Sequence, residues 1–131
     1  MFGALGEDMS AGSQVSAFCR DIVKTKLIWT IQFPDESFIK WINEDGSEVW
    51  PVWSTESRVK KTLKLSDVFE GGKAVSYSFD NFLVEWLPDL IEDNVGLGPN
   101  WAGDNLSGWS FEAQELIDRV RNTPGFIDEI T

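Results

Sequence analysis

The chain has 131 residues, of which 42% are hydrophobic, and carries 22 acidic against 11 basic residues, a formal net charge of −11. A chain of this length suits one core, so we expect residues 1–131 to form a single domain with flexible ends at 1–9 and 124–131. The acidity argues against nucleic-acid binding, and because no apolar run reaches a membrane span and no leader pattern is present, we expect a cytoplasmic protein.

Hydrophobic periodicity predicts one helix followed by strands in the first half of the chain. Helical spacing of apolar residues covers 10–24, and the period then changes from 3.6 to 2. Three strands are expected at 27–33, 37–43 and 48–53. Short turns join them, so we expect an antiparallel meander over about 27–53.

The second half alternates helices with short extended segments. We expect a short helix at 55–64 and a strand through Val75 and Tyr77. A helix capped by Asp80 should end or kink near Leu87, because Pro88 removes one backbone donor. The remaining elements are an extended segment at 94–101 and a last helix near 110–122, capped by Ser110. Together these elements predict an α+β fold with three to four helices packed mainly on one face.

The pair Asp45-Gly46 predicts a two-residue hairpin turn, because glycine accepts the positive φ that such a turn requires. In that register Trp41 faces Trp50 across the strands, and Trp53 lies on the core face. An even-numbered loop in the preceding turn would likewise place Phe33 opposite Phe38. The face opposite the core is then expected to carry Ile28, Thr30, Gln32, Ile39, Trp41, Asn43, Trp50 and Val52.

The residue inventory offers little catalytic chemistry. The sequence has no histidine and one cysteine, Cys19, which lies on the apolar side of the first helix and is expected to be a small buried hydrophobe. Carboxylates cluster at turns and helix ends, where solvated acids are expected. The group Asp89, Glu92 and Asp93 lacks the ligand spacing of a calcium loop. We therefore expect no catalytic residue, metal or cofactor.

Several segments carry a family resemblance: "WTIQ" (29–32), "DGSEVWPVWS" (45–54), the short helix after it, and "FDNFLVEWLPDLIEDNVGLGPNW" (79–101). They resemble domain-of-unknown-function family 2750, small bacterial proteins, over roughly residues 13–122. "PVW" and "FLVEWLPDL" are the most specific parts. The resemblance implies a small α+β domain with no established activity and no assigned catalytic residues.

Seven tryptophans are unusual for so short a chain. Either the last helix or the Gly/Asn-rich loop covers the second sheet face, or that face is an exposed aromatic patch that anchors a partner. The candidate partner- or ligand-binding residues are Thr30, Gln32, Ile39, Trp41, Trp50, Val52, Trp101 and Trp109.

Two functions compete on this evidence. The first is a non-enzymatic interaction protein whose acidic surface steers a basic protein partner, or which forms a homodimer; an inhibitor or immunity-type protein would fit. The second is a small-ligand-binding domain, or an enzyme with carboxylate chemistry, whose pocket is lined by Trp50, Trp101 and Trp109.

Overall fold

The structure, a computed structural model, describes residues 11–103 and 106–126. The predicted flexible end 1–9 and most of 124–131 lie outside these residues. The α-helices are α2 (Ala11–Thr25), α3 (Glu56–Leu63), α4 (Phe79–Glu85), α5 (Leu87–Glu92) and α6 (Ala113–Arg121). The strands are β1 (Leu27–Gln32), β2 (Trp41–Ile42), β3 (Glu48–Val52), β4 (Lys73–Ser78), β5 (Gly96–Pro99) and β6 (Phe111–Glu112). A short 3-10 helix covers Asp67–Phe69. None of the helices in the described part of the chain combines the length and apolar character that crossing a membrane requires.

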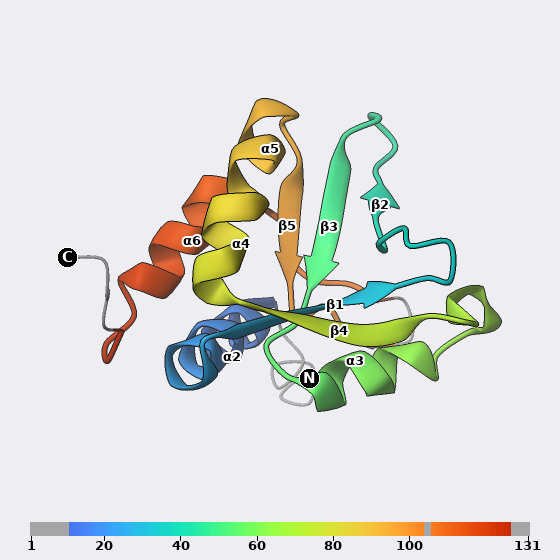
Figure 1. The fold of residues 1–131 in the computed structure, drawn as a ribbon, viewed down its shortest axis with the longest axis horizontal. Helices are drawn as coiled ribbons and strands as arrows, with labels where there is room; N and C mark the ends of the chain where they lie inside the picture. Colours follow the sequence, from blue (N-terminus) through green and yellow to red (C-terminus); the bar gives the residue numbers. More distant parts are fainter. Residues whose placement is uncertain (1–10, 104–105, 127–131) are drawn as a thin grey trace, which may run out of the picture.

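The strands form two sheets that meet near the middle of the molecule. β1 and β4 pair antiparallel, and the second sheet has the order β2-β3-β5-β6, with β3 and β5 parallel. Figure 1 shows the β1–β4 pair running across the lower ends of β3 and β5. Reciprocal backbone hydrogen bonds of 2.8 Å between Trp29 and Trp53 join the two sheets.

The α+β class is confirmed, but the regular meander and its register are wrong. β1 takes β4 as its ladder partner, and Gln32, not Phe33, stands opposite Phe38. Trp41 pairs with Val49 rather than with Trp50.

The cause of the register error is that both turns contain three residues, where the sequence predicted two in the Asp45-Gly46 turn and an even number in the turn before it. Glu36 and Gly46 take the left-handed third position of these loops, with φ of 73° and 88°. A one-residue slip turns every side chain to the other face of a strand. Trp41 and Trp50 therefore lie on opposite faces of the sheet.

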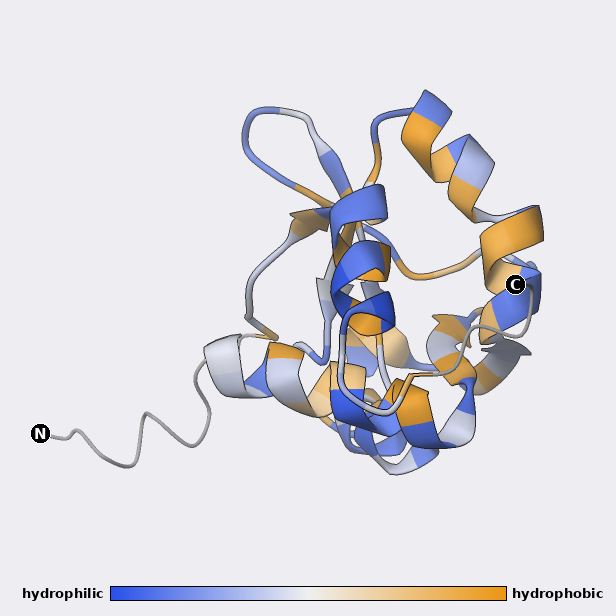
Figure 2. Cartoon of the chain, turned by 90° about the vertical axis from the view of Figure 1, so that its left-hand side faces the viewer, coloured by the Kyte–Doolittle hydropathy of each residue, from blue (hydrophilic) through white to orange (hydrophobic). Residues whose placement is uncertain are grey.

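Two apolar cores cover opposite sides of the strands. The larger core takes residues from α2, α4, α5 and α6 and from the strands, including Ile28, Val52 and Leu97. The smaller core contains Ile31, Ile39, Val49, Trp53, Val59, Trp101 and Leu106. Trp53 is fully buried, as predicted, and Cys19 is buried as well. Figure 2 shows hydrophobic and hydrophilic residues alternating along the helices, the pattern of helices with one buried side.

The helical segment around Pro88 breaks where the sequence predicts. Trp86 ends α4 and precedes α5, and Pro88 occupies the first turn of α5, where a missing amide hydrogen costs nothing. The predicted cap at Asp80 is wrong, because the Ser78 hydroxyl accepts the hydrogen bond from the Asn81 amide at 3.0 Å.

The predicted start of the last helix is also wrong. Residues 111–112 pair with β5 and stay extended, so α6 begins only at Ala113. Ser110 therefore lies ahead of β6 and does not cap the helix.

Candidate functional site

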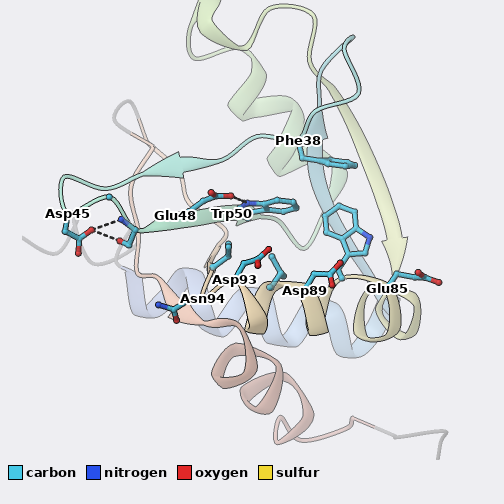
Figure 3. Close-up of a pocket in the computed structure, with 13 residues that line it drawn as sticks. Phe38, Asp45, Glu48, Trp50, Glu85, Asp89, Asp93 and Asn94 are labelled. Carbon is cyan, nitrogen blue, oxygen red and sulfur yellow. Dashed lines mark hydrogen bonds between the residues drawn. The ribbon is translucent and has the colours of Figure 1, made fainter.

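A groove of about 960 Å³ opens between β3 with its preceding turn and the α4–α5 segment. Figure 3 shows Glu48 and Trp50 on one wall, with Asp89 and Asp93 on the facing wall. Asp45 lies toward one end of this groove, and Phe38 toward the other. The groove thus joins residues that lie some forty positions apart in the sequence.

Five carboxylates line the groove, and they come from a helix, the end of another helix, a strand and a turn. Asp89 and Asp93 are four positions apart in α5 and its C-terminal cap, so they share one side of the helix. Glu85 is the last residue of α4, Glu48 is the first residue of β3, and Asp45 sits in the β2–β3 turn. Carboxylates therefore border the groove along its whole length.

Three aromatic rings form one end of the groove: Phe38, Trp50 and Trp86. The centroids of Phe38 and Trp86 are 4.8 Å apart, and those of Trp50 and Trp86 are 5.4 Å apart at an interplanar angle of 87°. These are edge-to-face contacts, which fix each ring against the next. Tyr77 and Phe82 also contact Trp86, so the rings form a packed, half-buried wall.

Glu48 brings one negative charge to this aromatic end. It lies two positions before Trp50 in β3, so both side chains leave the same face of the strand. The Trp50 indole N–H donates a hydrogen bond of 2.5 Å to Glu48 Oε2. A hydrogen bond to an ionised acceptor is stronger than a neutral one, so it fixes the carboxylate beside the rings.

Asp45 is held ionised at the opposite end. Its Oδ1 accepts hydrogen bonds from the Ser47 hydroxyl at 2.6 Å and from the Ser47 amide at 2.9 Å. These bonds stabilise the charged form and lower the pKa of the Asp45 carboxyl below its ordinary value. Asp35 has the same arrangement with Ser37 in the neighbouring loop, so the effect belongs to the turn and not to the groove.

The charge of the groove is of one sign. Of the described residues that line it, none is lysine or arginine. Two aromatic rings elsewhere already have cations from the chain itself, Phe126 with Lys26 Nζ at 3.8 Å and Phe111 with Arg119 Cζ at 4.8 Å. Across residues 11–103 and 106–126, no three His, Cys, Asp or Glu side chains are grouped so that they could hold a metal ion. The groove therefore offers dispersed negative charge beside aromatic faces.

The eight candidate residues from the sequence do not come together in one site. Trp50 lines the groove, whereas Thr30, Ile39 and Val52 are buried and cannot be reached from outside. Gln32 is half-buried, and its amide donates to the Glu36 carbonyl at 3.2 Å.

The three remaining candidates form a separate aromatic group. Trp101 is buried between the exposed Trp41, whose ring centroid is 6.0 Å away, and Trp109, whose carbonyl accepts from the Trp101 indole at 2.8 Å. The structure thus does not bring Trp101 and Trp109 to the groove that Trp50 lines.

Sequence reasoning missed most of the groove. Neither Phe38 nor Trp86 was among the candidate residues, and the carboxylates of Asp89 and Asp93 were interpreted as solvated acids. The signal was the spacing in the α4–α5 segment, where Trp86, Asp89 and Asp93 recur every three or four positions and so share one side.

These features define a small α+β domain with an acidic groove that has an aromatic end. The chain belongs to the family described as "Protein of unknown function (DUF2750)", whose sequence profile matches residues 15–120. This confirms the resemblance seen in the sequence. A search of curated proteins found no match.

Among solved structures, one similar chain is "Anabaena Tic22 (protein transport)". It is 12% identical, with a TM-score of 0.40, and the match covers 86% of this chain and 51% of that chain. The present chain therefore spans about half the length of that protein.

Proposed function

We propose that this chain is a non-enzymatic, cytoplasmic protein-interaction domain whose acidic groove binds a basic segment of a partner protein. The observation that carries the proposal is the combination of five carboxylates and three aromatic rings in one groove whose described lining has no lysine or arginine. An ammonium or guanidinium group is the ligand that both features attract.

The aromatic end attracts a cation in two ways, through the faces of its rings and through the carboxylate of Glu48. A cation over the face of a tryptophan gains about 0.5–2 kcal/mol, depending on how far it is desolvated. Trp50 and Trp86 are half-buried, and Glu48 is fixed beside them by the indole N–H. A cationic side chain placed there contacts rings and a carboxylate together, which is stronger than an ion pair on an open surface.

The distribution of the acids favours a protein segment over a small ligand. Small-molecule sites enclose their ligand and use a few convergent polar groups. Here the carboxylates extend from Asp45 at one end to Glu85 at the other. The net charge of −11 adds long-range steering, which raises the association rate with a basic partner.

The test is calorimetric titration with hexa-arginine and hexa-glutamate peptides at about 150 mM salt. We expect hexa-arginine to bind and hexa-glutamate not to bind. The double variant Asp89→Asn/Asp93→Asn should weaken hexa-arginine binding by about 2- to 30-fold, since each exposed pair contributes about 0.2–1 kcal/mol.

The matched control removes two exposed acids outside the groove, Asp67→Asn/Glu70→Asn. It changes net charge equally and should alter affinity less than about twofold at this salt concentration, where the Debye length is about 8 Å. Equal weakening by both double variants would mean that net charge alone binds the peptide. That result, or no binding at all, overturns the proposal.

A second candidate is self-association through β2, the edge strand of the four-stranded sheet. Ile42 and Trp41, which leave opposite faces of β2, are 57% and 43% exposed, although large apolar side chains usually lie inside. Light scattering after size-exclusion chromatography tests it: a dimeric wild type and a folded, monomeric Ile42→Glu variant support a homodimer, and a monomeric wild type excludes it.

A further inference from the structure

A second hollow, of about 440 Å³, continues the groove past the β2–β3 turn. Five residues line both spaces: Ser47, Glu48, Leu90, Asn94 and Val95. The far end of the second hollow is formed by β6 and the start of α6, with Phe111 and Gln114. The two spaces are therefore neighbours, and we call them together the trough, which extends from Trp86 to Gln114.

We propose that the occupant of this trough is an extended stretch of the partner chain, with its basic side chains at the tryptophan end and its uncharged residues in the second hollow. This inference rests on the proposed function, because it assumes that the groove binds a basic protein segment. It specifies the length of that segment and the order of its basic and uncharged residues.

The order follows from the two ends of the trough. The groove has five carboxylates, while the second hollow has Glu48, which the two share, and Glu112. Phe111, the aromatic ring of the second hollow, already carries Arg119 over its face. The chain's own cation therefore occupies the place that a ligand cation would take there, and the cationic residues of the ligand belong at Trp50 and Trp86.

The second hollow suits an uncharged peptide backbone. An extended chain presents amide N–H and carbonyl groups along its length, and each needs a partner when water is displaced. Asn43 and Gln114 line the hollow, and each uses one amide hydrogen inside the chain, for Ser47 Oγ and Asp118 Oδ1, both at 2.9 Å. Each side-chain amide has a second hydrogen and an oxygen, so it both donates and accepts.

The experiment compares peptides of equal charge and different length: acetylated and amidated RR, RRSASA and SASARR, titrated calorimetrically at about 150 mM salt. The two six-residue peptides cover both chain directions. We expect one of them to bind about tenfold tighter than RR, equivalent to about 1.4 kcal/mol.

A variant that blocks the second hollow tests whether the tenfold gain in affinity arises there. Ser110 is exposed and lines the second hollow, so the ring in Ser110→Trp fills that space. We expect Ser110→Trp to abolish the tenfold gain and leave RR affinity unchanged. Ser57→Trp places the same ring at an exposed position on α3, which lines neither space, and should change nothing.

The outcomes separate the two proposals. If RR and both six-residue peptides bind equally, or if the gain survives Ser110→Trp, the extended occupant is wrong and the basic-segment proposal stands. If neither hexa-arginine nor any of these peptides binds, the proposed function itself fails, and the extended occupant with it.

Discussion

The indole N–H of Trp53 donates a hydrogen bond of 2.9 Å to the backbone carbonyl of Trp101. Trp53 follows β3 directly and is fully buried in the smaller core, and Trp101 lies just after β5. One side chain therefore fills the core and also fixes the segment that follows the neighbouring strand.

Replacing Trp53 should destabilise the protein far more than replacing Trp50. Trp53→Ala leaves a cavity and an unpaired carbonyl, and we expect a loss of about 3–5 kcal/mol in the free energy of unfolding. Trp50 is half-buried at the groove wall, so Trp50→Ala should cost less. Urea denaturation followed by circular dichroism measures both. Equal losses would show that the groove wall is ordinary core.

Asn100 combines a buried hydrogen-bond network with an unusual backbone conformation. Its Oδ1 accepts from the Ser54 amide at 2.9 Å, and its φ is 53°. Asn100→Ala and Asn100→Gly both leave that buried amide unpaired, at a cost of about 1–3 kcal/mol.

The two variants of Asn100 should differ in stability, because alanine is strained in the left-handed backbone conformation and glycine is not. We expect Asn100→Gly to be less destabilising than Asn100→Ala by about 1 kcal/mol. Thermal or urea unfolding of the pair gives the difference. An alanine variant as stable as the glycine variant would show that the backbone conformation at this position imposes no strain.

The pKa of Asp45 depends on Ser47. Ser47→Ala removes the hydroxyl bond, the main cause of the lowered pKa, so the Asp45 pKa should rise toward its ordinary value. Because the pKa of Asp45 is lower in the folded state than in the unfolded state, the ionised carboxylate stabilises the folded protein at pH values above the unfolded-state pKa. This contribution is lost as the pH falls through the folded-state pKa. Carbon-13 NMR titration of the carboxyl measures the shift.

The loop that contains Asp35 and Ser37 gives the matched control for Asp45. Ser37→Ala should raise the pKa of Asp35 in the same way and leave Asp45 unchanged. A change at Asp45 in the Ser37 variant, or none in the Ser47 variant, would contradict the assignment of the shift to the turn hydroxyl.

Cys19 should be unreactive in the folded protein. Burial raises the pKa of its thiol, while Thr123, Arg119 and Arg20 oppose that shift, so little thiolate forms near neutral pH. We expect Ellman's reagent to react at least about tenfold more slowly with the native protein than with the urea-denatured protein. Equal rates would place the thiol at the surface.

The sequence allowed correct prediction of most elements because their signals are local. The apolar stripe of α2 and the break before Pro88 depend on neighbouring residues and were confirmed. The Asp45-Gly46 pair indicated a turn, but it suits two- and three-residue loops alike, and the difference reversed the face of Trp41. The pairing of β1 with β4 depends on residues more than forty positions apart, which no local pattern reports.

The candidate site was predictable only in part for the same reason. The sequence singled out Trp50, and the structure places that residue in the groove. Its contacts with Trp86 and Phe38 arise from packing between elements, and an apolar stripe in a helix does not reveal which of its rings stays half-exposed.

The most direct test of the central claim is a proton–nitrogen NMR titration of the tryptophan indole signals with hexa-arginine at about 150 mM salt. A cation in the groove competes for Glu48, which the Trp50 indole N–H contacts. We expect saturable shifts of the Trp50 and Trp86 signals, with that of the fully buried Trp53 unchanged. Shifts that are largest at Trp41 and Trp109, or that spread over all signals without saturating, would contradict the central claim.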